Sequence, residues 1–184
     1  MKLFFSLCFI FLGIKGIAQV PLTATEMLNT AFAKARLENK NVFVKFTASW
    51  CGWCKKMDAS MEDPVCKKLF DDNFVFVQLV VDESEKNKSL ENPGADSVRL
   101  KYNGDENQGI PFWFILDSNA KLLGDCYIRS KGEGINEKGN NIGCPANAEE
   151  VAAFIEVLKK TTKLNAAELA IIQERFRKNE VKRN

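Results

Sequence analysis

Two cysteines separated by two residues are the side chains of this sequence best suited to chemistry. Cys51 and Cys54 belong to the motif WCGWC at residues 50–54, which follows an apolar run over residues 42–46 and begins a helix-like segment. The first N–H groups of a helix lack intrahelical partners, and the helix dipole places partial positive charge there. A thiol at such a position has a pKa of ~3.5–7.5 instead of ~8.5. The spacing therefore predicts that Cys51 is an attacking thiolate and that Cys54 closes a disulfide with it.

Histidine is absent from the 184-residue sequence, and its absence excludes several kinds of active site. A Ser-His-Asp triad, a Cys-His pair and an HExxH metal site all require an imidazole. The formal charge of +2 and the lack of a basic block give no indication of nucleic-acid binding. The apolar content of 46% and charged content of 27% are typical of a globular domain.

The first 18 residues differ from the rest and are predicted to be a signal peptide. A short positive start is followed by an apolar run over residues 3–14 and by small residues at 16–18. An uncleaved anchor is the alternative, but the run is shorter than the ~20 residues that span a bilayer. We expect an exported protein, periplasmic or secreted, with residues 19–184 as a single domain. Removing Lys2 and Lys15 leaves that domain with equal numbers of basic and acidic residues.

Hydrophobic periodicity predicts strands that alternate with helices. Helices are expected from Thr23 or Thr25 to about Asn39, from the cysteine motif to about Met61, and over residues 63–71 and 95–102. Strands are expected over residues 41–47, 74–81, 111–116 and 121–129, followed by a long surface loop over 130–145. Two final helices begin at Asn147 and Asn165, each three residues before a glutamate, as in a capping box. This order favours an α/β layered fold with a mixed sheet flanked by helices.

The sequence resembles the thioredoxin superfamily, and especially its secreted bacterial members. The matching pieces are the strand over 42–47, the cysteine motif, the strand ending in Val81-Asp82, the Ile110-Pro111 pair and the turn over 117–121. The resemblance covers residues 25–161 and implies a thioredoxin fold, with Pro111 in the cis form against the cysteine pair. The helical extension over 165–184 and the loop over 130–145 lie outside the common fold.

The resemblance implies a protein thiol–disulfide oxidoreductase. Cys51 attacks a substrate disulfide and Cys54 resolves the mixed disulfide. The residues implied to bind the substrate are Trp50, Gly52, Trp53, Ile110 and Pro111. We expect the partners to be cysteines of exported proteins and an upstream redox partner, and we expect no cofactor, no metal and a monomer.

The motif departs from that of thioredoxin at several positions. Lys45 replaces a buried carboxylate, and Gln78 replaces a lysine on the next strand. Lys45 either points toward the disulfide, where its charge favours a thiolate, or extends to the surface. Trp53 replaces the proline of reducing members, whereas Ile110 matches them, so the indications of direction conflict. We expect a reductase.

The remaining cysteines of the domain are expected to be structural. Cys66 lies on a predicted helix and is interpreted as a small buried apolar residue. Cys126 and Cys144 flank the long loop and could form a disulfide in an oxidising compartment.

Two other functions are compatible with the fold. A zinc site could use the CxxC pair, but the sequence offers no second CxxC and no histidine. A binding or chaperone-like module could use the terminal helix and the loop over 130–145 as its contact surface. The intact cysteine pair favours the oxidoreductase.

Overall fold

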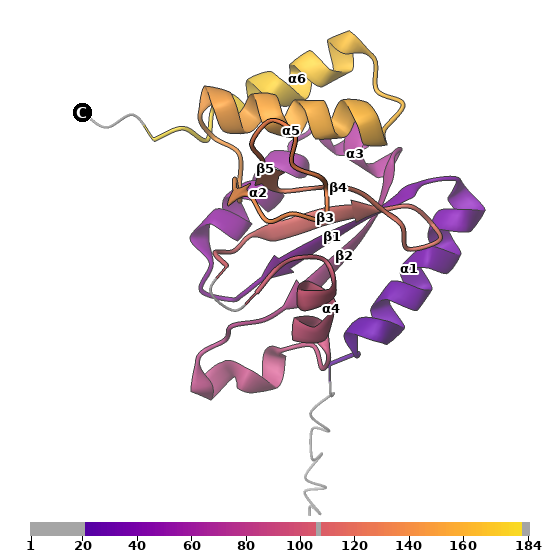
Figure 1. Cartoon of the computed structure of the whole chain (residues 1–184), viewed down its shortest axis with the longest axis vertical. Coiled ribbons are helices and arrows are strands. Elements are labelled where there is room, and N and C mark those ends of the chain that lie inside the picture. Colours follow the sequence, from indigo (N-terminus) through magenta and orange to yellow (C-terminus); the bar gives the residue numbers. More distant parts are fainter. Residues whose placement is uncertain (1–20, 106–107, 182–184) are drawn as a thin grey trace, which may run out of the picture.

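A four-stranded mixed sheet forms the centre of the computed structural model, which describes residues 21–105 and 108–181 (Figure 1). The strands are β1 (Asn41–Thr47), β2 (Phe74–Val80), β3 (Phe112–Leu116) and β4 (Leu122–Asp125). Their order is β2-β1-β3-β4, with β1 parallel to β2 and antiparallel to β3. β1 is therefore a central strand, and it delivers the chain to the cysteine motif at its C-terminal end.

Helices cover both faces of the sheet (Figure 1). They are α1 (Ala24–Glu38), α2 (Gly52–Met61), α3 (Lys67–Asp71), α4 (Ala95–Lys101), α5 (Ala148–Thr161) and α6 (Ala166–Arg177). The indigo helix α1 and α4 lie below the sheet in Figure 1, and α5 and α6 lie above it. This arrangement confirms the predicted α/β fold with a mixed sheet flanked by helices.

Alternation along the strands divides the aromatic core between the two faces. Phe43 stacks on Trp113, and Trp113 meets Phe154 of α5 on one face. On the other face Phe46 packs against Phe114, which contacts Tyr102 at the end of α4. Burying each such ring contributes ~1.5–3 kcal/mol. The core therefore fixes the end of β1, and with it the position of the cysteines.

Local capping signals confirm three of the predicted helix starts. Thr23, Asn147 and Asn165 each form a capping box with the glutamate three residues later. The predicted helix over 63–71 is shorter than expected, because residues 64–66 form a turn and α3 begins only at Lys67.

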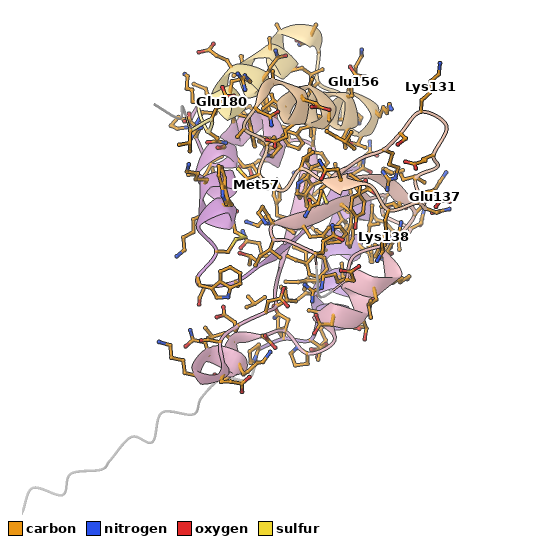
Figure 2. The ribbon with its side chains drawn as sticks, turned by 60° about the vertical axis from the view of Figure 1, so that its left-hand side comes forward. Met57, Lys131, Glu137, Lys138, Glu156 and Glu180 are labelled. Atoms are coloured by element: carbon orange, nitrogen blue, oxygen red, sulfur yellow. A yellow bond between two sulfur atoms is a disulfide. The ribbon has the colours of Figure 1, made fainter. Side chains whose placement is uncertain are left out.

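The region after β3 differs most from the prediction. The expected strand over 121–129 is interrupted at Cys126, and β5 (Tyr127–Ile128) pairs instead with β6 (Asn140–Asn141) in a second small sheet. The segment between β5 and β6 projects from the body, and Lys131, Glu137 and Lys138 point outward along it (Figure 2). After β2 the polar segment over residues 82–92 contains a short 3-10 helix, η1 (Glu85–Leu90).

The predicted signal peptide over residues 1–18 lies outside the described residues. Within the described part of the chain, no helix combines the length and apolar character needed to cross a membrane. The helical extension packs on the domain through the buried residues Leu169, Ile172 and Phe176 of α6.

Candidate active site

Cys51 and Cys54 form a disulfide at the junction between β1 and α2. Cys51 is the N-cap of α2, and its Sγ accepts a hydrogen bond from the backbone N–H of Cys54 at 3.1 Å. Once the disulfide is reduced, the same N–H and the helix dipole favour negative charge on that sulfur. Both residues are buried, and Cys51 is the less buried of the two, with 3% of its residue surface exposed against none for Cys54. The geometry thus distinguishes an outer sulfur from an inner one.

The segment that precedes β3 lies against the outer sulfur. The Ile110–Pro111 peptide bond is cis, and the Ile110 carbonyl oxygen lies 3.7 Å from Cys51 Sγ. Ile110 packs against the small cluster formed by Ala48, Cys51 and Cys54. The structure therefore brings together the cysteine motif and the proline that the sequence places about 60 residues apart.

Two tryptophans flank the disulfide on the surface. Trp50 is 59% exposed and Trp53 is 44% exposed. The Lys56 ammonium lies 4.4 Å above the Trp53 ring, at the distance of a cation–π contact. Exposed aromatic rings beside a reactive group are a suitable platform for a protein substrate.

An open groove of about 560 Å³ runs beside the proline. Its lining includes Trp53, Ile110, Pro111, Cys144 and Val181. Three of these belong to the predicted substrate-binding set, whereas the last two come from the loop before α5 and from the C-terminal segment. Sequence reasoning missed this contribution, because no local pattern places the chain end beside the motif.

Lys45 points into the protein rather than to the surface, so the alternative in which it extends to solvent is wrong. Its side chain is 3% exposed and pairs with Asp58 of α2, which also accepts a hydrogen bond from Gln78 at 3.2 Å. Burial lowers the pKa of the Lys45 ammonium, and Asp58 opposes this effect. Asp58 follows Cys54 by one helical turn, which is the signal that could have predicted a carboxylate near the pair.

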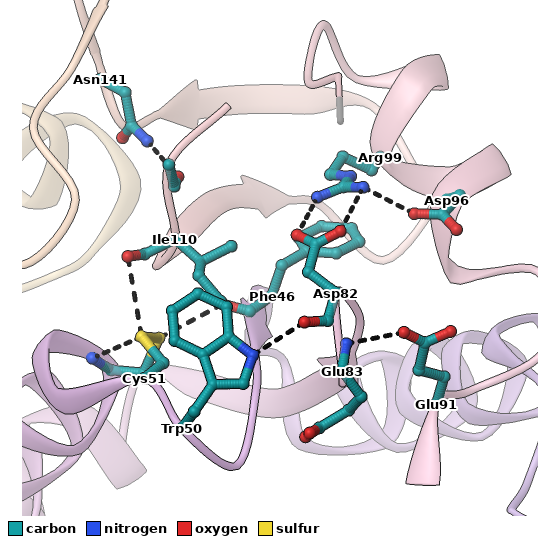
Figure 3. Close-up of polar contacts among 12 residues, drawn as sticks. Phe46, Trp50, Cys51, Asp82, Glu83, Glu91, Asp96, Arg99, Ile110 and Asn141 are labelled. Atoms are coloured by element: carbon teal, nitrogen blue, oxygen red, sulfur yellow. Dashed lines mark hydrogen bonds and ion pairs between the residues drawn. A yellow bond between two sulfur atoms is a disulfide. The ribbon is translucent and has the colours of Figure 1, made fainter. Parts of the chain in front are cut away.

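A second polar network lies on the other side of the motif (Figure 3). Trp50 Nε1 donates to the carbonyl oxygen of Asp82 at 2.8 Å, and the Ser49 Oγ donates to the Glu83 carboxylate at 2.7 Å. The hydrogen bonds from Ser49 lower the pKa of Glu83. Arg99 of α4 forms a bidentate pair with the Asp82 carboxylate. The role of Arg99 could not be predicted from the sequence, because its contacts depend on the packing of α4.

Cys66, Cys126 and Cys144 are free and buried, so the possible disulfide between Cys126 and Cys144 is not formed. The backbone N–H of Cys126 donates to the Trp113 carbonyl oxygen, and the Cys126 carbonyl oxygen accepts from the N–H of Ile142. The chain then turns at Gly143, which has a φ of 52°, and the Cys144 sulfur accepts a hydrogen bond from Asn179 at 3.6 Å. The thiols therefore occupy different surroundings, although they flank one loop.

Gly52 does not adopt a backbone conformation that requires glycine. Gly52 is the first residue of α2, its φ lies outside the left-handed region, and no atom of the described residues lies within 4 Å of an added Cβ. Among the residues that the structure describes, no group of three or more His, Cys, Asp or Glu side chains could hold a metal ion.

A cysteine pair at a strand–helix junction beside a cis proline defines a thioredoxin-type redox site. The thioredoxin-like family model matches residues 23–118, more than half of the sequence. The chain therefore belongs to the thioredoxin-like family. This membership, together with the disulfide-forming pair, supports a protein thiol–disulfide oxidoreductase.

Three of the solved structures that are similar to this chain are a disulphide isomerase, a domain of DsbD and an oxidoreductase. A disulphide isomerase from Xylella fastidiosa is 22% identical, with 55% of this chain and 72% of that chain covered and a TM-score of 0.46. The oxidised C-terminal domain of DsbD from Neisseria meningitidis is 24% identical, with 57% and 84% covered and a TM-score of 0.40. A DsbH oxidoreductase is 19% identical, with 83% and 94% covered and a TM-score of 0.43. No curated protein sequence matches this chain significantly.

Proposed function

We propose that the Cys51–Cys54 pair exchanges electrons with cysteines of exported proteins and acts as a reductase. The observation that carries the proposal is the disulfide at the N-terminus of α2, with its outer sulfur on the N-cap. A sulfur that already accepts a backbone N–H is prepared to carry the negative charge of a thiolate.

In the proposed cycle the reduced protein begins with a Cys51 thiolate and a Cys54 thiol. The thiolate attacks one sulfur of a substrate disulfide, and the other substrate sulfur leaves as a thiolate and takes up a proton. Cys54 then loses its proton and attacks the Cys51 sulfur, which releases the second substrate thiol. Two electrons pass to the substrate and the Cys51–Cys54 disulfide forms. A dithiol donor must reduce this disulfide before the next cycle.

The exposed Trp50 and Trp53 rings and the groove along Ile110 and Pro111 support a role in holding the substrate chain. The groove adjoins the outer sulfur, because the Ile110 carbonyl oxygen lies next to Cys51. We assign substrate binding to these side chains and to Gly52, where an added Cβ would meet open space.

The reduction potential of the Cys51–Cys54 pair tests the proposed direction. Tryptophan fluorescence in graded thiol buffers reports the oxidation state of the pair. A potential near that of thioredoxin, about −270 mV, supports a reductase, whereas a value near −120 mV identifies a disulfide-forming oxidant. A folded protein without any redox transition contradicts the proposal and favours the binding module.

Trapping variants test the roles of the two sulfurs. Cys54→Ser keeps the nucleophile and removes the resolving thiol, so it is expected to accumulate mixed disulfides with substrate proteins. Cys51→Ser is the matched control and is expected to trap none. Full biological activity of Cys51→Ser indicates a binding function instead.

Export of a monomeric protein is part of the same proposal. The apolar N-terminal residues support cleavage after about residue 18. Mass spectrometry of the protein recovered from the periplasm or medium tests it, and a chain that retains residue 1 contradicts it. Size-exclusion chromatography with light scattering tests the monomer.

A further inference from the structure

We propose that Arg99 is a positioning residue for the redox site, acting through Asp82 on the indole of Trp50 (Figure 3). This inference rests on the proposed thiol–disulfide exchange and adds a residue from α4, which lies outside the cysteine motif. Two direct contacts connect the guanidinium to the indole: Arg99 to the Asp82 carboxylate, and the Asp82 carbonyl oxygen to Trp50.

The first contact fixes the Asp82 carboxylate in one plane. Arg99 is 2% exposed, and its two terminal nitrogens donate to the two Asp82 oxygens at 2.7 and 3.1 Å. Asp96 accepts a further hydrogen bond at 2.7 Å, whereas Arg99 Nε has no partner among the described residues. An added Cβ at Gly104 would lie 2.5 Å from Arg99 Cγ, so the stem of the side chain is tightly enclosed. The guanidinium therefore depends on these carboxylates and has little room for another orientation.

The second contact passes through the backbone of Asp82. Asp82 has a φ of 55°, in the left-handed region that residues with a Cβ adopt at a cost. In this conformation its side chain faces Arg99 while its carbonyl oxygen accepts from Trp50 Nε1 at 2.8 Å. A change at Asp82 therefore moves the acceptor of the indole.

Trp50 has little else to fix its orientation, because 59% of its surface is exposed. An exposed ring is free to rotate unless a directional contact holds it. The hydrogen bond to Asp82 supplies that contact, directly before the nucleophile Cys51.

Glu83, the residue after Asp82, binds Ser49 in the turn that precedes Cys51. Glu83 is 6% exposed, its carboxylate accepts from the backbone N–H and the Oγ of Ser49, and its own N–H donates to Glu91 at 2.8 Å. The turn is closed by the Cys51 N–H, which donates to the Ala48 carbonyl oxygen at 3.0 Å. Consecutive residues thus hold Ser49 and Trp50, so an arginine on α4 helps to preorganise the approach to Cys51.

The test compares Arg99→Met with Arg129→Met, a matched control. Arg129 also forms a bidentate pair with a buried aspartate, Asp125, but the pair has no contact with Trp50 among those that the structure describes. NMR resonances of the indole N–H groups report the effect directly. In Arg99→Met we expect the Trp50 resonance to shift and its hydrogen exchange to accelerate about tenfold. The Trp113 indole, bonded to Gly143 at 2.8 Å, should stay unchanged in both variants.

Activity gives the second readout. We expect Arg99→Met to lower kcat/KM for reduction of insulin about tenfold and that for glutathione disulfide by less than about threefold, because only the protein substrate needs the indole platform. Arg99→Lys keeps the charge but not the bidentate geometry and should give an intermediate loss. Trp50→Phe and Arg99→Met remove the same contact, so the loss of kcat/KM in the double variant should be smaller than the two single losses combined.

Several outcomes overturn the inference. They are an unchanged Trp50 resonance in Arg99→Met, an equal shift in Arg129→Met, and fully additive losses in the double variant. If Arg99→Met does not fold, the indole resonance of Arg99→Lys decides in the same way. A wild-type protein that cannot exchange disulfides contradicts the proposed function, whereas the indole resonances still decide whether Arg99 positions Trp50.

Discussion

Lys45 and Asp58 form an ion pair between β1 and α2 in which the ammonium is the more buried partner. The Lys45 side chain is 3% exposed and the Asp58 side chain 36%. Because Asp58 follows Cys54 by one helical turn, the pair lies beneath the helix that carries the redox site. This unequal burial makes the two partners unequal in their contribution to stability.

Removing the carboxylate should cost more than removing the ammonium. Asp58→Asn leaves the buried Lys45 charge with neutral neighbours and is expected to lower the free energy of unfolding by about 1–3 kcal/mol. The ~3–5 kcal/mol typical of a fully buried pair is reduced here by the exposure of Asp58. Lys45→Met should stay within about 1 kcal/mol of wild type. Urea denaturation measures both, and a larger loss in Lys45→Met contradicts the assignment.

The same pair predicts a pH dependence of stability. Burial lowers the pKa of Lys45 in the folded protein, so the unfolded chain binds more protons in the window between that pKa and the ordinary lysine pKa of about 10.4. The destabilising effect of the charged lysine is complete below this window and disappears as the pH rises through it. The stability of wild type relative to Lys45→Met should therefore increase with pH toward about 10.4. If the difference in stability between wild type and Lys45→Met does not change with pH, the pKa of Lys45 is not lowered in the folded protein.

The lowered pKa of Glu83 predicts that the stability of the protein also depends on pH in the acid range. The Ser49 backbone N–H, with smaller effects from other hydrogen bonds, lowers the pKa of Glu83. Its contribution is complete above the ordinary glutamate pKa and is lost as the pH falls through the lowered pKa of the folded state. Wild type should lose stability relative to Glu83→Gln as the pH falls through this range. Thermal unfolding of the two proteins between neutral pH and about pH 3 provides the measurement.

Thiol labelling tests the state of the cysteines that lie outside the motif. Burial raises the pKa of Cys66 to about 11 and that of Cys144 to about 12, and it raises the pKa of Cys126 further. In a chain that begins at residue 19, the folded oxidised protein should expose no thiol to Ellman's reagent. Denaturation without a reductant should expose all three thiols. If only one thiol reacts after denaturation, Cys126 and Cys144 are bonded to each other, contrary to the structure.

Asn179 connects the C-terminal segment to the helix of the active site. It is 7% exposed, and its Nδ2 donates to Ser60 Oγ at 2.9 Å and to the Pro145 carbonyl oxygen at 3.3 Å. Asn179→Ala leaves these groups without their partner and should lower the free energy of unfolding by about 1–3 kcal/mol. The exposed Asn29→Ala on α1 is the control and should change it by less than about 0.5 kcal/mol. Equal effects of the two substitutions would exclude a structural role for Asn179.

Features defined by neighbouring residues could be predicted from the sequence. The cysteine pair at the beginning of α2 and the capping boxes at Asn147 and Asn165 follow from residues within one or two helical turns. The alternation of apolar runs was enough to indicate a mixed sheet flanked by helices. At the end of α6, however, the charged sequence does not indicate that Asn179 is buried.

The features that could not be predicted are contacts between residues far apart in the chain. Asp82 and Arg99 are separated by 17 positions, and Ser60 and Asn179 by 119. The burial of Lys45 depends in the same way on a carboxylate from another element. Periodicity shows which face of a helix or strand is apolar, but it does not show which polar group of another element lies opposite. The cysteine pair and its place at a helix N-terminus could therefore be predicted without the fold. Only the packing of α4 and α6 decided which side chains hold the surrounding turns, because a buried polar group must take whichever partner the fold brings within hydrogen-bonding distance.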